Sequence, residues 1–355
     1  MAIFTTDIID FGEQPLFFGT DGRNIARLDI NSEPFIDKMT KRHRSMFWLP
    51  HDVSYSQDAI DYTIMSENRR EFFLKNLKFQ TLLDSAATRG VLECFLPVCT
   101  SPQLESWLCV HGFMESIHSD SYAEIIKALG IDASEVFDDI MVNGHILARG
   151  EEIVSYFNNM HSVAAQWSIG PQVVSDYKKE ALVQALYMLN ILENILFKTS
   201  FICSFAFAEN GVMEGSTKTV QNINFDETLH YGMTIYLIKR LSKDPEYAQI
   251  FEDNKEWAVQ RYQSAYDADI KWVDYLYETD PGLIGISSNI LKAYSLYNIR
   301  QTMSKIGLDP IGSELDNPVP WATKYLSTGN VQTALNETDG VNYLFGSLDK
   351  DMEEW

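Results

Sequence analysis

Two carboxylate residues stand where the sequence predicts hydrophobic helix faces. Glu193 lies in the segment LYMLNILENILF and Asp84 lies in FQTLLDSAA, so both acids have apolar neighbours on adjacent helical turns. A carboxylate buried alone is strongly destabilising, or its pKa rises until it is neutral, so each acid needs a cationic partner. The nearest base to Glu193 is Lys198, which projects from a different face. A metal ion is the other partner that neutralises buried acids.

Two Glu-x-x-His motifs could complete such a metal site. They read ESIH at residues 115–118 and ETLH at residues 227–230. Residues i and i+3 project from the same side of a helix, so each motif can offer one oxygen and one imidazole nitrogen to a common ion. With 7 histidines and 50 acids in 355 residues, about one such spacing is expected by chance. Either histidine alone, or Asp84 alone, would more often be structural, so the prediction depends on the whole set.

The whole set matches the ligand pattern of a ferritin-like di-metal carboxylate bundle. In that pattern two helices each give one carboxylate and two further helices each give a Glu-x-x-His pair. Oxygen-rich sites with one imidazole per ion suit iron or manganese better than zinc. We therefore predict an all-α, ferritin-like helical bundle that holds two metal ions per chain, either iron or manganese. The predicted metal ligands are Asp84, Glu115, His118, Glu193, Glu227 and His230.

Helical periodicity runs through most of the chain, and very little of it is typical of strands. Ser101 followed by Pro102 is typical of a helix start. The middle of the segment 175–209 is apolar nearly all round, as expected of a central helix in a helical protein. Glycine and proline breaks separate the helical blocks. The predicted helices cover residues 67–87, 101–129, 175–209, 218–241, 252–278 and 288–306.

The character of the chain changes from Asn317 onward. The stretch NPVPW is expected to be extended and stiffened by its prolines. The remaining tail is polar but carries Tyr343, Leu344, Phe345 and Trp355 among acids, which is typical of a short peptide that docks on a partner. We predict one domain over residues 1–325 and a flexible tail over residues 326–355.

Composition limits the cellular compartment and the classes of binding partner that we expect. The chain has 28 basic and 50 acidic residues and a formal charge of −22, which argues against binding nucleic acid or anionic membranes. It has no uncharged apolar run of about 18 residues, and its first residues lack the basic region of a secretory signal. Cys94, Cys99, Cys109 and Cys203 are expected to be buried free thiols. These features together predict a cytoplasmic protein that binds neither nucleic acid nor membrane.

Several stretches resemble the small, radical-generating subunit of class I ribonucleotide reductases. In the order of that family they are PLFFG, FFLKNLKFQTLLDS, ESIHSDSY, FKTSFICSFAFAE with MEG, DETLH, NILKAYSLYNIR with IGL, NPVPW and YLFG. They run from about residue 15 to residue 345, so the resemblance covers nearly the whole chain.

The resemblance implies specific roles around the metal site. Asp84, Glu115 and His118 would hold one iron and Glu193, Glu227 and His230 the other, with Glu115 and Glu227 able to bridge. Tyr122, which lies four residues after His118, matches the tyrosine that the family oxidises to a stable radical. The apolar lining of its pocket corresponds to Phe197, Phe201 and Ile223.

The resemblance also implies a path for the radical. Trp48 and Asp226 match the family's electron relay, with His118 between Asp226 and the metal. Tyr343 matches the mobile tyrosine that passes the oxidation to the large subunit, and Glu337 matches an acid that assists near it. From the residues alone, Trp48 could equally be a core aromatic and Tyr343 an anchor of the docking peptide.

Two features depart from the family pattern. The segment between Tyr122 and Glu193 is compact and leaves no room for the extra hairpin that some members carry. His111 stands where we expect a tryptophan or a glutamine beside the site. A histidine at this place could form a hydrogen bond with a ligand carboxylate or alter the choice of metal.

The resemblance implies the activity of a ribonucleoside-diphosphate reductase. A di-metal centre would react with O₂ and oxidise Tyr122, and the stored radical would initiate reduction of ribonucleotides to deoxyribonucleotides in a separate large subunit. The chain itself has no phosphate-binding GxxxxGK[ST] motif, and a homodimer is expected. One alternative is a ferritin-like di-metal oxidase that acts on a small molecule without a partner subunit. Another is a metal-storage or noncatalytic bundle.

Overall fold

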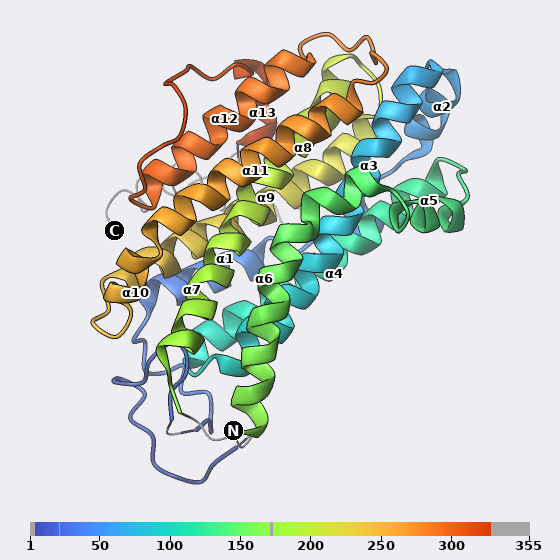
Figure 1. Ribbon diagram of the computed structural model, residues 1–355. Helices are drawn as coiled ribbons and strands as arrows, with labels where there is room; N and C mark the ends of the chain where they lie inside the picture. The colour runs from blue at the N-terminus through green and yellow to red at the C-terminus, as the bar shows by residue number, and fades with distance from the viewer. Residues whose placement is uncertain (1–3, 21, 171–172, 328–355) are drawn as a thin grey trace.

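The computed structural model describes residues 4–20, 22–170 and 173–327, and within these ranges it is built from helices without a β-strand. The long helices lie side by side along a common direction (Figure 1), which confirms the predicted all-α class. The α-helices are α1 (Pro34–Ser45), α2 (Ser56–Ile64), α3 (Glu67–Arg89), α4 (Pro102–Ala128), α5 (Ala133–Ile140), α6 (Gly144–Ile169), α7 (Asp176–Asn190), α8 (Phe197–Glu209), α9 (Glu214–Ser242), α10 (Ala248–Asp253), α11 (Lys255–Leu276), α12 (Ser288–Lys305) and α13 (Thr323–Leu326).

Two π-helical segments interrupt the regular helices. They are η2 (Gly90–Phe95), which continues α3, and η4 (Ile191–Leu196), which joins α7 to α8. The sequence predicted one helix over 175–209, and the structure has that helix with a π segment in its middle. Segments of this kind are rare and occur often at functional sites. In this chain η4 carries Glu193.

The apolar helix Asp176–Glu209 forms part of the core. By length and composition it could cross a membrane, but 94% of its most apolar window is buried inside the protein. Its segments α7, η4 and α8 pack against α9, while α3 packs on α4 and α11 on α12. The buried aliphatic and aromatic side chains of these helices form one continuous cluster. Helices in a bundle core are expected to be apolar on most sides.

The six predicted helices are present, with shifts of a few residues at most ends. The predicted 252–278 helix corresponds to α11, and the short helix α10 directly before it was not predicted. Helices α1, α2, α5 and α6 were not predicted. Helices α5 and α6 occupy the compact segment between Tyr122 and Glu193, where the structure has no strand hairpin.

Two sequence expectations are wrong. The stretch NPVPW is not extended throughout, because Pro320–Ala322 forms a 3₁₀ turn that leads into α13. Cys109 is exposed, whereas Cys94, Cys99 and Cys203 are buried free thiols as expected. Cys109 lies on the outer face of α4, two positions before His111 on the inner face, so apolar neighbours in the sequence did not reveal its side.

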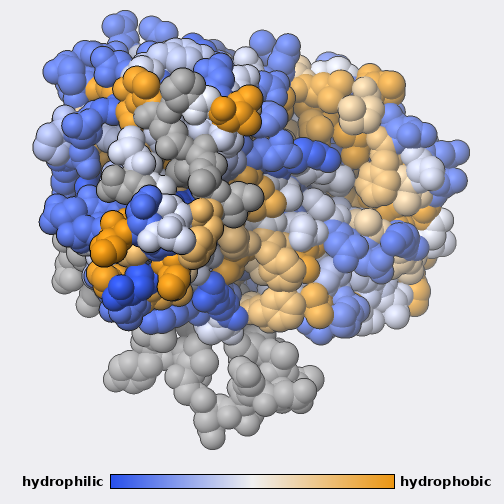
Figure 2. All heavy atoms as spheres, turned by 90° about the horizontal axis from the view of Figure 1, so that it is seen from below, coloured by the Kyte–Doolittle hydropathy of each residue, from blue (hydrophilic) through white to orange (hydrophobic). Residues whose placement is uncertain are grey.

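The surface is not uniformly polar. Seen from below, hydrophobic side chains gather over part of the molecule (Figure 2). Phe47 and Phe113 are each about half exposed, at 52% and 49%, and their rings stack with centroids 6.0 Å apart. Exposed aromatic pairs of this kind are common where another protein binds.

The start of α9 is held by two acids of α2. Asp58 accepts hydrogen bonds from the backbone N–H of Gly215 (2.9 Å) and Ser216 (2.5 Å) and from the Ser216 hydroxyl (2.6 Å). Asp61 accepts from the backbone N–H of Met213 (2.9 Å). Carboxylates at a helix N-terminus satisfy its free N–H groups and interact favourably with its dipole. These contacts fix the start of the helix that carries residues 226–230.

Replacing Asp58 by alanine is expected to lower the free energy of unfolding by about 2–3 kcal/mol, because a buried cap and its hydrogen bonds are lost. Urea unfolding of the metal-free chain measures the change. Asp37→Ala, which removes an exposed acid that pairs with Lys41, is the control and should change stability by less than about 0.5 kcal/mol. Equal effects of the two substitutions would show that Asp58 does not hold α9.

Candidate metal centre

Four helical segments bring the six predicted ligands together in the core. Asp84 comes from α3, the ESIH pair from α4, Glu193 from η4 and the ETLH pair from α9. Among these segments α3 packs on α4, and α9 packs on both α4 and η4, so the acids lie inside the bundle. The side chains of Asp84, Glu115, His118, Glu193, Glu227 and His230 are all 0% exposed.

The two histidines mark two centres. His118 Nδ1 lies 3.3 Å from Asp84 Oδ1 and 3.0 Å from Glu227 Oε1. His230 Nδ1 lies 2.9 Å from Glu115 Oε1 and 2.9 Å from Glu227 Oε2. It also lies 3.7 Å from Glu193 Oε2.

Two carboxylates reach both centres. Glu227 directs one oxygen to each histidine, and Glu115 directs Oε2 to His118 (3.6 Å) and Oε1 to His230 (2.9 Å). Each thus has the arrangement that a bridging carboxylate needs. The structure therefore brings all six predicted side chains into one cluster, and their role as ligands remains a prediction.

The donor atoms fit two divalent ions. One set of mutually close ligand atoms comes from Asp84, Glu115, His118 and Glu227, and a second comes from His111, Glu115, Glu193 and His230. Within the part of the chain that the structure describes, several of the carboxylate oxygens accept no hydrogen bond, although buried oxygens normally do. They are Asp84 Oδ2, both oxygens of Glu115, Glu193 Oε2 and Glu227 Oε1. Cations would satisfy these oxygens.

In the metal-free cluster, four of the ionisable groups have pKa values above their ordinary ones. Burial raises the pKa of Asp84 and of Glu193 well above the ordinary carboxyl value. Burial alone would lower the pKa of His118 and His230, but the surrounding carboxylates outweigh it and hold both values well above the ordinary one. These four groups therefore favour their protonated forms.

We expect metal binding to release protons from those four groups, because an ion needs their free lone pairs. Anaerobic calorimetric titration with Mn(II), repeated in buffers of different ionisation enthalpy, should show release of about two to four protons per chain at pH 7. Affinity should rise with pH, since deprotonation then costs less. Affinities and proton counts that do not change between pH 6 and pH 8 would contradict this.

Tyr122 is completely buried on α4, one turn after His118. Burial, and then the charge of Asp84, raise the pKa of its phenol well above 10, so the phenol is neutral. Its hydroxyl lies close to Asp84 but makes no hydrogen bond of normal geometry among the described residues. Phe197, Phe201 and Ile223 are also 0% exposed, and the two phenylalanine rings stack with centroids 5.6 Å apart. All four side chains are therefore buried away from water, and the role of the three apolar ones as the pocket of Tyr122 stays a prediction.

A hydrogen-bonded path leads from the cluster to Trp48. The indole Nε1–H of Trp48 donates to Asp226 Oδ2 (2.8 Å), and the same oxygen lies 3.1 Å from His118 Nε2. With a proton on Nε2 donated to Asp226, His118 keeps Nδ1 free for an ion. Burial would raise the pKa of Asp226, but hydrogen bonds from His118 and His43 hold it below its ordinary value.

Sequence analysis missed His43 and did not settle His111. His43 Nε2 lies 3.2 Å from Asp226 Oδ1. It shares the buried face of α1 with Phe35, Met39 and their neighbours, so recognising that helix would have revealed it. His111 Nε2 lies 3.1 Å from Glu193 Oε1, in agreement with the contact to a ligand carboxylate that the sequence suggested. Burial lowers the pKa of His111 to about 4, so its ring is neutral.

Lys198 does not neutralise the cluster directly. Its ammonium group donates to Asn224 Oδ1 (2.5 Å) and to Thr228 Oγ1 (2.9 Å), and no hydrogen bond or ion pair joins it to one of the six predicted ligands among the described residues. Burial lowers the pKa of Lys198 to about 7. Tyr343, Glu337 and nearly all of the predicted 326–355 tail lie outside the described residues.

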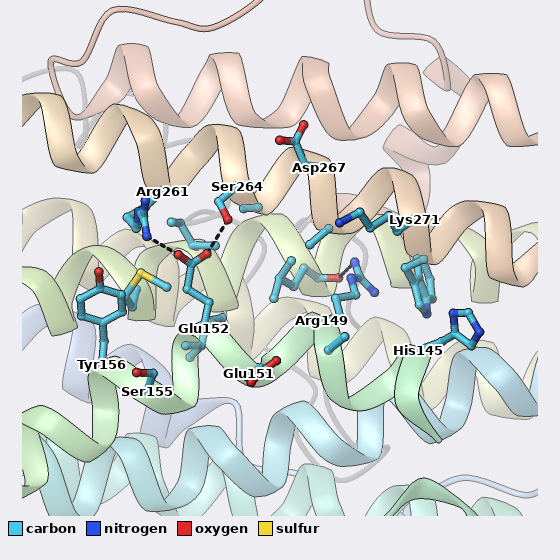
Figure 3. Close-up of a pocket in the computed structure, with 18 of the residues that line it drawn as sticks. His145, Arg149, Glu151, Glu152, Ser155, Tyr156, Arg261, Ser264, Asp267 and Lys271 are labelled. Carbon is cyan, nitrogen blue, oxygen red and sulfur yellow. Dashed lines mark hydrogen bonds and ion pairs between the residues drawn. The ribbon is translucent and has the colours of Figure 1, made fainter. Parts of the chain in front are cut away.

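A separate cavity of about 980 Å³ lies between α6, α7 and α11. Figure 3 shows Glu152 of α6 pointing across it to Arg261 and Ser264 of α11, and the Ser264 hydroxyl donates to Glu152 at 2.7 Å. Its wall includes Ile191 and Leu196 of η4, but none of the six predicted ligands lines it. The metal cluster is thus enclosed by the core and does not face this cavity.

Comparison with known proteins agrees with this geometry. Residues 30–318 match the family described as ribonucleotide reductase, small chain. Ribonucleoside-diphosphate reductase 1 subunit beta of Salmonella typhimurium is 36% identical, over 96% of this chain and 94% of the relative.

Solved structures of similar fold include two bacterial proteins. The ribonucleotide reductase R2 subunit from Clostridium botulinum has a TM-score of 0.75 at 21% identity, covering 92% of this chain and 99% of that one. Streptococcus sanguinis dimanganese(II)-NrdF has a TM-score of 0.69 at 20% identity, covering 85% and 98%. On the family match and the 36% identity over nearly the whole chain, this protein belongs to the small-chain family of ribonucleotide reductases.

Proposed function

We propose that this chain is the radical-generating small subunit of a ribonucleoside-diphosphate reductase. The observation that carries the proposal is the buried phenol of Tyr122 beside a cluster of four acids and two imidazoles. In our proposal a radical on Tyr122 starts the reduction of ribonucleotides in a separate large subunit. Family membership supports the reaction class, because the curated relatives carry the name ribonucleoside-diphosphate reductase.

The six buried side chains would hold two ions, which we propose to be iron, with manganese as the alternative. Both metals suit a donor set dominated by carboxylate oxygen. When bound, two such ions would couple the reduction of O₂ to the oxidation of a nearby phenol: the two ions would give two electrons, the phenol one, and an external reductant such as excess Fe(II) the fourth. The related structure from Streptococcus sanguinis is named for its manganese, which keeps that alternative open.

The chain's own residues protect and pass on the radical. The Tyr122 hydroxyl is buried away from water and makes no hydrogen bond of normal geometry among the described residues, so few groups can reduce a phenoxyl radical formed there. Phe197, Phe201 and Ile223 are proposed to line its pocket with groups that carry neither protons nor accessible electrons. Asp226 accepts the hydrogen bond from Trp48 and orients His118, and we propose that electrons travel along this path.

Anaerobic loading with Fe(II) followed by O₂ tests the proposal. We expect about two irons per chain and the electron paramagnetic resonance (EPR) signal of a tyrosyl radical. The chain alone should reduce no ribonucleotide, and addition of a large subunit should restore turnover. Two bound irons per chain without any radical signal would contradict the proposal, and many irons per chain would favour metal storage.

The tail is proposed to dock on the large subunit and to carry Tyr343 as the last residue of the relay. Deletion of residues 344–355 should abolish binding to the large subunit, measured by surface plasmon resonance, and leave the radical signal unchanged, because metal binding uses only the helical core. Tyr343→Phe is the matched control: it should bind the large subunit normally but support no turnover. Full affinity of the truncated chain would refute the docking role.

A homodimer is proposed as the working form. Phe47 and Phe113 offer an exposed apolar pair at the surface formed by α1 and α4, which a second copy could cover. Light scattering of the wild type and of Phe113→Asp measures the oligomeric state.

We also propose a cytoplasmic location, in agreement with the buried free thiols of Cys94, Cys99 and Cys203.

A di-metal oxidase acting on a small molecule remains the competing function. Such an oxidase needs a substrate cavity that reaches the metals. The cavity of Figure 3 reaches η4 only through Ile191 and Leu196, so it does not supply that access. Turnover of a small molecule by the chain without any large subunit would favour the oxidase.

A further inference from the structure

His111 lies inside the metal cluster. It is 1% exposed and is carried by α4, one turn before Glu115. Its Nε2 is 3.1 Å from Glu193 Oε1 and 3.3 Å from Glu115 Oε1. Both carboxylates belong to the set proposed to hold the ions, so the imidazole directs a nitrogen at the same space as their oxygens.

The spacing of these atoms is that of ligands around one ion. Adjacent ligands of an octahedral ion, each about 2.1 Å from it, lie about 3.0 Å apart. The two distances from His111 Nε2 match this value closely. His230 Nδ1 approaches the same Glu115 oxygen at 2.9 Å. The two imidazole rings stack with centroids 3.6 Å apart, so one ring must turn about its Cβ–Cγ bond before both in-plane lone pairs can point at one ion. The two nitrogens are therefore presented side by side to a common oxygen.

We propose that His111 is a direct ligand of the ion held by Glu193 and His230. The proposal rests on the di-metal function above and changes the donor set of only one site. That second site would then offer two imidazoles, from His111 and His230, together with Glu193 and the bridging carboxylates Glu115 and Glu227. The first site keeps one imidazole and three carboxylates, from Asp84, Glu115, His118 and Glu227.

The unequal donor sets predict unequal metal preferences. Imidazole nitrogen suits iron and cobalt, whereas carboxylate and water suit manganese and magnesium. His111 therefore favours Fe(II) or Co(II) over Mn(II) at the second site and leaves the first site unbiased.

The other role open to His111 is donation of a hydrogen bond to Glu193. If Nε2 carries the proton and donates it to Glu193, Nδ1 has no proton and needs a hydrogen-bond donor. Nδ1 has no hydrogen-bond partner among the described residues. Coordination through Nε2 would place the proton on Nδ1 instead, and that atom would then need an acceptor or water. Because each role leaves Nδ1 unsatisfied, only a direct measurement on the metal-loaded chain separates them.

A crystal structure of the full chain loaded anaerobically with Co(II) is the direct test. Coordination is expected to place His111 Nε2 about 2.1 Å from the second ion. A separation above about 3 Å, with His111 bonded to Glu193, would overturn the proposal while leaving the di-metal function intact. Absence of ions from the cluster would overturn both.

Metal competition in solution gives a second readout that does not depend on activity. Glutamine at position 111 can donate to Glu193 through its amide, so His111→Gln keeps a donor and loses the imidazole. We expect it to weaken Co(II) binding at one of the two sites by at least about tenfold and to change Mn(II) binding less. Affinities within about threefold of wild type for both metals would show that the imidazole only donates.

His43→Gln is the matched control. It also removes a buried imidazole next to His230, with ring centroids 5.0 Å apart, but its nitrogen faces Asp226 and no proposed ligand carboxylate. It should leave the preference for Co(II) over Mn(II) as in wild type. An equal loss of Co(II) affinity in both variants would attribute the effect to general disturbance of the core and would overturn the assignment of His111.

Discussion

Tyr122→Phe is expected to abolish the radical signal and to reduce ribonucleotide reduction with a large subunit to background. Phenylalanine has no O–H group, so no phenoxyl radical can form at this position. The substitution should not disturb the fold, because the buried Tyr122 hydroxyl makes no hydrogen bond of normal geometry among the described residues. Removing an unsatisfied buried hydroxyl is neutral or stabilising. EPR after addition of Fe(II) and O₂, with metal analysis of the same sample, measures the outcome.

Tyr262→Phe is the control for this experiment. Tyr262 is also completely buried, but its hydroxyl donates to Asn190 Oδ1 at 2.5 Å. The control should keep the radical signal and lose about 1–2 kcal/mol of stability, because the amide oxygen is left without its donor. Comparison of the two variants thus distinguishes loss of the radical from loss of stability. A tyrosyl signal that persists in Tyr122→Phe would place the radical elsewhere.

The cluster of acids and histidines could be predicted from the sequence because its members violate ordinary core composition. An acid such as Glu193 within a run of leucines and isoleucines must have an unusual partner. The i, i+3 spacing of the Glu-x-x-His pairs then identifies the shared helix face. The structure brings these side chains to within 2.9–3.7 Å of the two histidines.

Other parts of the site had no such signal. His43 contacts Asp226 across a tertiary contact between α1 and α9, and periodicity does not specify which helices meet. The π segment that carries Glu193 has the same apolar composition as the helix around it. Helix α6 was overlooked although its buried residues, such as Ile146, Ile153 and Phe157, recur with helical spacing between polar ones.

The two halves of the cluster are supported unequally, because the Nε2 atoms of His118 and His230 have different surroundings. One imidazole, His118, has a carboxylate behind it in Asp226, whereas the Nε2 atom of His230 has no hydrogen-bond partner among the described residues. A histidine whose far nitrogen is held by a carboxylate is a stronger and better oriented ligand. His118, on the side of the cluster that faces Trp48, is therefore the better oriented imidazole. This agrees with the proposed electron path through His118.

Asp226→Asn is expected to separate radical formation from radical use. The substitution removes the negative charge from the group that faces Trp48 Nε1, His118 Nε2 and His43 Nε2. One end of the new amide is itself a donor, so the amide cannot accept hydrogen bonds from all three. Tyr122 should still be oxidised, because its position beside the cluster does not depend on Asp226. Turnover with the large subunit should fall about 10- to 100-fold, as for loss of a carboxylate that supports a metal-bound histidine.

Trp48→Phe provides the matched variant, since it keeps a buried aromatic ring and removes only the indole donor of the Asp226 contact. Both variants should show the wild-type EPR signal and metal content, bind the large subunit normally, and fail in turnover. A packing role for Trp48 predicts the opposite pattern, with lower thermal stability and near-normal turnover per radical. If Asp226→Asn turned over at more than half the wild-type rate per radical, electrons would have to leave the cluster by another path, and the hydrogen-bonded path through His118 would be only structural.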